Sequence, residues 1–198
     1  MEEDTKLNKR EKQRMERRQQ ILECSLDMII ARGYEAMKIR DIANKLNIST
    51  GLFFNYFESK EKIYEELVKI GLAGPKSIFK MNMDEIEPIE FFERMTETVF
   101  ESLISYSITG KMFLLMAQTM KSETAPESVK NMVAHFDAVT TIVSVIRSGQ
   151  NLGQIKEGDP VALAVAYWGA VQGVAESFVF LDNLPLPKSS WIVDILRK

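Results

Sequence analysis

Apolar residues recur at intervals of three or four along most of this chain, the spacing that places them on one face of an α-helix. Long stretches with this spacing cover residues 11–32, 59–74, 88–107, 126–147 and 161–181, and shorter ones cover 39–46, 50–57, 111–121 and 189–197. Gly33, Pro75 and Gly110 are expected to end the helices before them, because glycine and proline are poor residues for a helix interior. No stretch alternates apolar and polar residues as a half-buried β-strand does. The pattern predicts an all-α protein.

Two of the short helices lie close together, at residues 39–46 and 50–57. Asn47 between them tolerates the left-handed backbone of a sharp turn, and Ser49 can cap the second helix through its hydroxyl. Phe53 and Phe57 are expected to face the core, since paired aromatic residues at helical spacing usually do. This is the helix-turn-helix pattern, in which the second helix enters the major groove of DNA. The alternative is a pair of helices that only pack against each other.

The residues around this pattern resemble the DNA-binding domain of the tetracycline repressor family of bacterial transcriptional regulators. The resemblance spans about the first third of the chain and is carried by Ile21-Leu22, Gly33-Tyr34, Ile39-Arg40-Asp41-Ile42-Ala43, Ile48-Ser49, Gly51, Phe53-Phe54-Asn55-Tyr56-Phe57 and Ser59-Lys60-Glu61. It implies an N-terminal three-helix helix-turn-helix domain at residues 1–60, followed by a helical ligand-binding and dimerisation domain at residues 61–198. Met37 and Lys38 depart from the family, which often has threonine there; Met37 cannot cap the following helix.

The outer side of the second short helix is expected to face DNA. Thr50, Leu52 and Asn55 point outward if Phe53 and Phe57 point inward. The resemblance implies that Tyr56 and Lys60 clamp the DNA backbone. The predicted DNA-binding residues are Lys38, Arg40, Ser49, Thr50, Gly51, Leu52, Phe54, Asn55, Tyr56 and Lys60. Most of these contacts would position the protein without specifying a sequence.

The net charge of −3 does not indicate nucleic-acid binding, but its distribution does. Residues 5–60 carry twelve Lys/Arg against seven Asp/Glu, whereas residues 61–198 carry thirteen against eighteen. The basic excess therefore coincides with the helix-turn-helix, where phosphates would require it. Within it, residues 5–20 are dense in Lys and Arg; they are either a solvated helix start or an arm that touches DNA.

The composition leaves little chemistry for an enzyme or a metal site. The chain has one cysteine, Cys24, and one histidine, His135, with no ligand-spaced partner for either. Glu90, Glu93, Glu97 and Glu101 form a row of carboxylates, but the Glu-x-x-His pairs of di-iron bundles are absent, so we interpret the row as a solvated helix face. We expect no enzyme activity, no cofactor and no metal. The lone thiol and the charged N-terminus, which lacks an apolar signal segment, favour the cytoplasm.

Four methionines gather between residues 112 and 132, where flexible thioethers suit either an adaptable pocket or an ordinary Met-rich core. The resemblance favours a pocket. The predicted lining is Met112, Met116, Met120, His135, Phe136, Trp168 and Gln172.

Residues 161–181 are apolar enough for a membrane span, with a Gly169-x-x-x-Gly173 spacing that lets helices approach closely. Gln172, Glu176 and the lack of flanking Lys/Arg clusters argue against a span and for a helix buried within protein. In the family the two C-terminal helices form a four-helix bundle with their symmetry mates. The predicted dimer interface is Val165, Gly169, Gly173, Trp191 and Ile195.

Together these patterns predict a cytoplasmic, ligand-responsive transcriptional regulator, most often a repressor in such a family. It would bind a palindromic operator in double-stranded DNA as a homodimer and be released by a small, largely apolar molecule, with no membrane partner. The alternative is a DNA-binding protein of the same fold without a small-molecule effector.

Overall fold

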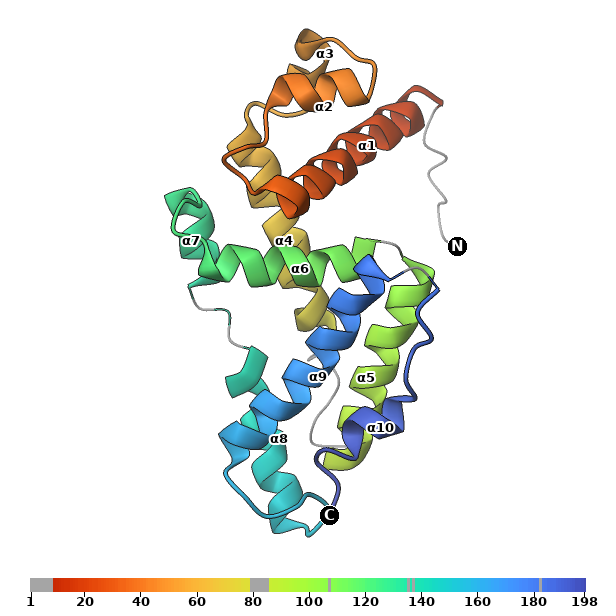
Figure 1. Ribbon diagram of the computed structural model, residues 1–198, viewed down its shortest axis with the longest axis vertical. Coiled ribbons are helices and arrows are strands. Elements are labelled where there is room, and N and C mark those ends of the chain that lie inside the picture. Colours follow the sequence, from red (N-terminus) through yellow and green to blue (C-terminus); the bar gives the residue numbers. More distant parts are fainter. Residues whose placement is uncertain (1–8, 79–85, 107, 135, 137, 182) are drawn as a thin grey trace, which may run out of the picture.

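The computed structural model describes residues 9–78, 86–106, 108–134, 136, 138–181 and 183–198, and helices dominate this part of the chain (Figure 1). In chain order the helices are α1 (Lys9–Arg32), α2 (Ile39–Lys45), α3 (Thr50–Phe54), α4 (Lys60–Ile78), α5 (Pro88–Ser105), α6 (Ile108–Lys121), α7 (Glu127–Val133), α8 (Ala138–Asn151), α9 (Pro160–Phe180) and α10 (Ser189–Val193). One isolated β-bridge, between Ile155 and Arg197, is the only extended pairing within these residues. The predicted all-α fold is confirmed.

The first hydrophobic core joins α1–α3 to α4, α6 and α7. Its fully buried residues include Ile21, Leu26, Ile42, Phe53, Ile63, Leu67, Leu115 and Val129. Figure 1 shows α1–α3 at one end of the molecule, with α4 running from them to α6. This core extends past residue 60 into α4 and across to α6, so the domain boundary at residue 60 stays a prediction.

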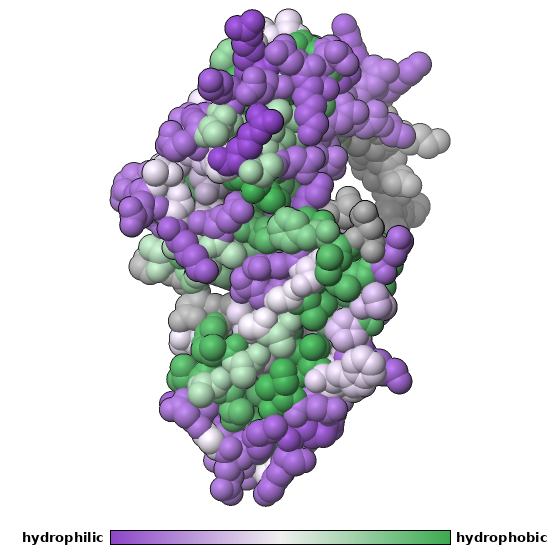
Figure 2. Space-filling model, in the orientation of Figure 1, coloured by the Kyte–Doolittle hydropathy of each residue, from purple (hydrophilic) through white to green (hydrophobic). Residues whose placement is uncertain are grey.

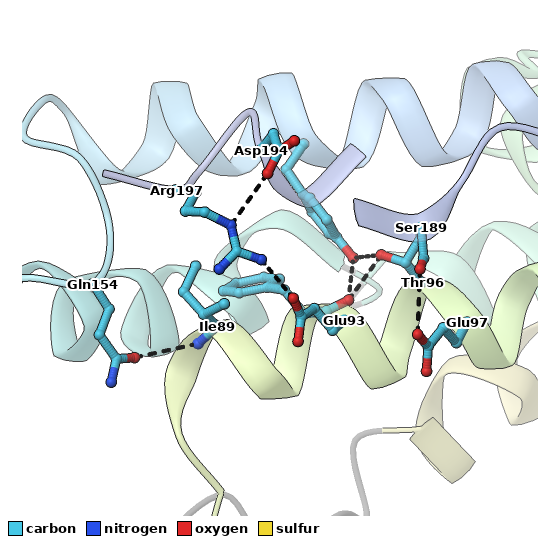
Figure 3. A network of polar contacts seen from close by, with 10 residues as sticks. Ile89, Glu93, Thr96, Glu97, Gln154, Ser189, Asp194 and Arg197 are labelled. Carbon is cyan, nitrogen blue, oxygen red and sulfur yellow. Dashed lines mark hydrogen bonds and ion pairs between the residues drawn. The ribbon is translucent and has the colours of Figure 1, made fainter. Parts of the chain in front are cut away.

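The second core lies among α5, α8, α9 and α10 at the other end of the molecule (Figure 1). Tyr167 of α9 is fully buried, and its hydroxyl lies 2.7 Å from the Thr96 hydroxyl on α5. Polar contacts at the surface fasten the C-terminal segment to α5: Arg197 pairs with Glu93, and Ser189 donates to Glu97 at 3.3 Å (Figure 3). The chain end is therefore part of this unit.

Two predicted helix ends were wrong. Helix α4 continues past Pro75 to Ile78. A proline cannot donate the backbone hydrogen bond to the carbonyl four residues earlier, yet the helix runs on for three residues beyond it. Gly110 lies in the first turn of α6 instead of ending α5. A Cβ there would stand 2.7 Å from Val179 Cγ2 and 3.0 Å from the Ala175 carbonyl oxygen, so glycine permits the close approach of α6 to α9.

Two predicted helices are also shorter than the periodicity indicated. The expected helix 126–147 is divided into α7 and α8, because Val129 packs in the first core whereas Ile142 and Ile146 pack in the second. The last helix ends at Val193, not at Arg197. Beyond it the chain extends to pair with Ile155, and the Lys156 N–H donates to the Leu196 carbonyl at 2.9 Å.

Candidate nucleic-acid interface and effector cavity

The turn between α2 and α3 has the predicted chemistry. Asn47 has a positive φ of 52°, and the Ser49 hydroxyl accepts a hydrogen bond from the Leu52 N–H at 3.0 Å. Helix α2 begins after Lys38 with no side-chain cap, as expected from Met37 and Lys38. One local capping bond therefore fixes the start of α3, which has only five residues.

The two sides of α3 differ as predicted. Phe53 is fully buried and Phe57, just beyond the helix, is nearly so. Thr50, Gly51 and Asn55 are exposed, and Leu52 and Phe54 expose 37% and 51% of their surface. Lys38 and Arg40 at the start of α2 are exposed too. The predicted DNA-binding residues are therefore exposed to solvent, except Tyr56 and Lys60, which are half-buried.

A groove of about 760 Å³ lies between the N-terminal half of α1 and α3. It is lined by Arg10, Gln13, Arg14, Glu16, Arg17 and Gln20 from α1 and by Leu52, Asn55 and Tyr56 at α3. The sequence indicated a basic arm but not that it shares a groove with the second helix of the motif. The signal was the spacing of Arg10, Arg14 and Arg17, which places all three on one face of a helix.

Not every arginine of this segment faces the groove. Arg18 pairs through both terminal guanidinium nitrogens with the Glu66 carboxylate of α4, and its guanidinium carbon lies 4.7 Å from the centre of the Phe57 ring. Such a two-pronged pair stacked on an aromatic ring is suited to holding elements together. Arg18 therefore braces α1 against α4.

Lys60 also makes contacts inside the protein. Its Nζ lies 3.4 Å from the carbonyl oxygens of Tyr34 and Glu35 and 4.3 Å from the centre of the Tyr34 ring. Burial raises the pKa of Tyr34, and its hydrogen bond to Glu61 adds to the shift. Hydrogen bonds from the Ser59 hydroxyl, which has the larger effect, and from the Tyr34 hydroxyl hold the pKa of Glu61 below its usual range. This cluster ties the α1–α2 turn to α4, and the backbone-clamp role of Lys60 stays a prediction.

Three polar contacts connect α6 to α1 and α4. Asp27 of α1 accepts from Lys111 Nζ at 2.6 Å and lies 3.9 Å from Lys45 Nζ of α2. The hydroxyls of Tyr64 on α4 and Thr119 on α6 are 2.9 Å apart and buried. Gln118 donates to the Ile30 carbonyl at 3.3 Å. A displacement of α6 would therefore pull on or break contacts of α1 and α4 directly, and of α2 through Asp27.

A cavity of about 270 Å³ lies among α4, α5, α6 and α9. The structure brings the predicted residues Met112, Met116, Met120, Phe136, Trp168 and Gln172 together in its lining. His135 lies outside the described residues. Sequence reasoning missed the walls contributed by Ile70, Gly71 and Gly74 of α4 and by Thr98 and Ser102 of α5. Those positions carry no chemical signal, because only the packing of four helices places them around one space.

Helix α9 has one buried and one exposed side. Ala164, Tyr167, Val171 and Ala175 are buried. On the other side Val161 and Val165 are half-exposed, and a Cβ added at Gly169 or Gly173 would meet nothing within 4 Å. Figure 2 shows a broad apolar area over α8 and α9, bordered below by hydrophilic residues. Of the other predicted interface residues, Trp191 is 61% exposed and Ile195 is half-buried.

By length and composition α9 could cross a membrane, although a core helix of a soluble protein can meet the same criteria. Among the residues that the structure describes, no three or more metal-binding side chains gather at one place.

Residues 21–67 match the family model for bacterial regulatory proteins of the tetR family. The matched segment is that of a tetR-family regulatory protein. A stretch of 108 residues is 38% identical to the transcriptional repressor KstR2 of Mycobacterium tuberculosis and covers 54% of each chain. A 53-residue stretch is 36% identical to KstR2 of Mycolicibacterium smegmatis and covers 27% of this chain and 26% of that one. The matches thus span about half or less of these curated relatives.

Solved structures show the same fold over nearly the whole chain. The ketosteroid transcriptional regulator KstR2 of Mycobacterium tuberculosis matches with a TM-score of 0.66 and 19% identity, covering 92% of this chain and 95% of that one. AibR in complex with isovaleryl coenzyme A and operator DNA matches at 0.65 and 15% identity, over 90% and 94%. PfmR from Thermus thermophilus matches at 0.65 and 22%, over 88% and 93%. The predicted family, and a regulatory protein rather than an enzyme, are confirmed.

Proposed function

We propose that the protein is a homodimeric repressor of transcription that binds a palindromic DNA operator and releases it when a small molecule occupies the cavity. The observation that carries this proposal is the groove between α1 and α3. Its arginines lie beside the exposed residues of a short helix that is capped and anchored to the core. Positive charge next to an outward-facing helix is what a duplex requires, since phosphates supply most of the affinity.

Different residues of this surface would do different work on DNA. Arg10, Arg14 and Arg17 would neutralise phosphates, whereas the exposed side of α3 would meet base edges. The Asn55 amide can pair with adenine or with the backbone, and the Phe54 ring can contact a thymine methyl group. The arginines would thus set affinity and salt dependence, and α3 would set base preference.

A second copy of the chain is the partner that best suits the exposed side of α9. Its small residues, Gly169 and Gly173, let another helix approach closely, and an apolar area of this kind on a soluble protein usually marks an interface. A two-fold axis there would present two α3 helices to one face of a duplex. A lipid bilayer is the competing occupant.

Helix α4 is the element that can couple the cavity to DNA. Its first half packs in the first core through Ile63, Tyr64 and Leu67, and its second half borders the cavity through Ile70 and Gly71. A molecule that binds one position of α4 better than another would shift the population of α3 spacings. The similar folds of KstR2, a ketosteroid regulator, and AibR, solved with an acyl-coenzyme A and operator DNA, support a link between ligand and DNA.

The test is selection of bound sequences from random duplex DNA with the full-length protein, followed by titration of the selected duplex at several salt concentrations. We expect a palindromic site, a steep salt dependence and two chains per duplex. The mass of the free protein, measured by light scattering without detergent, should be that of a dimer. A protein that retains no duplex at low salt would overturn the DNA proposal, and one that stays soluble only in detergent would favour a bilayer over a second copy.

A further inference from the structure

The cavity among α4, α5, α6 and α9 has an almost wholly apolar wall. Its lining includes three methionine thioethers and the rings of Phe113, Phe136 and Trp168. Among the described lining residues there is no Lys, Arg, His, Asp or Glu. A charged group placed there would lose its hydration without gaining a partner, which is strongly unfavourable.

Three polar side chains of the wall donate hydrogen bonds along their own helices. Thr98 donates to the Arg94 carbonyl at 2.8 Å, and Ser102 donates to the Thr98 carbonyl at 2.7 Å, both along α5. Gln172 donates to Glu176 at 2.6 Å along α9. The wall therefore offers a few neutral hydrogen-bonding groups, among them the Gln172 amide and the Thr109 hydroxyl, rather than a cradle for an ion.

The Met116 side chain of α6 packs unusually close to the backbone of α4 at Gly71. A Cβ added at Gly71 of α4 would stand 2.6 Å from Sδ and 2.8 Å from Cγ of Met116 on α6. A Cβ added at Gly74, three residues further along the same helix, would meet nothing within 4 Å. The Met116 side chain thus occupies a notch in α4 that exists only because residue 71 has no side chain.

We propose that a compact, uncharged and largely apolar molecule binds this cavity, and that it acts on α4 by displacing Met116 from the notch at Gly71. The ligand chemistry is independent of DNA, whereas the action on α4 rests on the proposed function. The volume of about 270 Å³ equals the liquid volume of roughly nine water molecules, at about 30 Å³ each. That space suits one or two fused rings or a short branched chain.

Displacement of Met116 has a direct mechanical consequence. Protein interiors are close-packed, so a side chain pushed out of its place must move a neighbour or change rotamer. Methionine has three rotatable bonds and adapts to a ligand readily, but at Gly71 its sulfur faces the backbone of α4, which cannot rotate away. Because Tyr64 of α4 is tied to Thr119 of α6, a shift between these helices is transmitted toward the helix-turn-helix.

The ligand chemistry is tested with two probes that share one aromatic skeleton and differ in charge. Neutral 2-naphthol and its anionic analogue 6-hydroxynaphthalene-2-sulfonate are titrated into the full-length protein, and their fluorescence is recorded. We expect the neutral probe to bind at least about tenfold more tightly, a difference of 1.4 kcal/mol. Ala117→Leu, which adds an apolar side chain to the cavity wall, should weaken the neutral probe without lowering the thermal midpoint.

Three results would overturn the ligand chemistry. One is equal or tighter binding of the sulfonate. Another is neutral-probe binding that Ala117→Leu does not weaken, which would place the probe elsewhere. The third is tight binding of isovaleryl coenzyme A, whose phosphates have no partner among the described lining residues.

The action on α4 is tested with the matched variants Gly71→Ala and Gly74→Ala. Both gain the same helix propensity, so they differ in the contact with Met116. Gly71→Ala should imitate the ligand and weaken binding to the selected duplex by about 5- to 150-fold, the usual range of coupling between sites. Gly74→Ala should weaken it far less, because the added Cβ meets nothing within 4 Å. Met116→Ala added to Gly71→Ala should restore affinity, with folding followed by circular dichroism.

The outcomes separate this inference from the proposed function. If the wild-type protein binds no duplex, the proposed function fails. The ligand chemistry is then decided by the two fluorescent probes, whose binding does not depend on DNA. If the wild type binds DNA and Gly71→Ala binds equally well, or if Gly71→Ala and Gly74→Ala weaken binding alike, the Met116 contact is refuted and the DNA-binding function stands.

Discussion

The outer sides of α3 and α9 both face solvent, yet their chemistry is opposite. Beside α3 the exposed residues Leu52 and Asn55 share a groove with three arginines of α1. The exposed side of α9 carries valine and glycine and no charged residue from Val161 to Gly173. Each helix is anchored by a buried opposite side, through Phe53 in α3 and Tyr167 in α9. The outer residues alone therefore decide what each surface can bind.

This difference implies that binding at the two surfaces depends on salt to very different degrees. Binding that depends on phosphates weakens steeply as salt rises, because each contact releases condensed counterions. Binding that depends on apolar area is nearly insensitive to moderate salt, since no charge is neutralised. The α3 surface suits a polyanion, and the α9 surface suits an apolar copy of itself.

A charge at the centre of the α9 surface should produce the largest effect. Val165→Asp would bury a carboxylate, with its symmetry mate, in the dimer interface, at a cost of about 3–5 kcal/mol for an unpaired buried charge. We expect monomers by light scattering and loss of operator binding, with an unchanged helical signal in circular dichroism. Val165→Thr, which keeps the shape without a charge, should remain dimeric. A dimeric Val165→Asp protein would place the interface elsewhere on the molecule.

A smaller effect is expected from an arginine of the groove. Arg14→Gln should lower the slope of log affinity against log salt by about one unit, the share of a single phosphate contact, and weaken binding roughly tenfold at 0.1 M salt. Arg18→Gln is the matched control on the same helix, because Arg18 pairs with Glu66. It should cost about 1 kcal/mol of stability or less, as exposed ion pairs do, and leave the slope unchanged. Equal slopes for Arg14→Gln and wild type would remove the arm from the interface.

The α2–α3 region could be predicted because its chemistry is local. Asn47 in a left-handed turn, Ser49 at a helix start and Phe53 at helical spacing each constrain a backbone within four residues. A capping bond or a turn preference depends on neighbours in the chain. The same holds for Asp159, which accepts from the N–H groups of Val161 and Ala162 at the start of α9.

The features that the sequence did not predict depend on distant packing. Gly110 is a contact with α9 rather than a helix end, and Pro75 is tolerated within α4. Lys60 lies on Tyr34 because two segments meet there in space. The division between α7 and α8 follows from two separate cores, although the apolar periodicity runs on through both. Periodicity shows which side of a helix is buried but not against which neighbour.

Removing the capping side chain from each helix should give the smallest effects and sharpen the comparison between them. Ser49→Ala and Asp159→Ala should each cost about 1 kcal/mol of stability in thermal unfolding. Their functional consequences should differ, because α3 has five residues and α9 has twenty-one. Loss of the first turn would disorder most of the DNA-facing side of α3 but leave the exposed side of α9 around Gly169 intact. Ser49→Ala should therefore weaken operator binding, whereas Asp159→Ala should stay dimeric and bind normally. The conservative variants Ser49→Thr and Asp159→Asn should restore the caps and lost stability. Unchanged operator affinity in Ser49→Ala would mean that burial of Phe53 alone holds α3 in place.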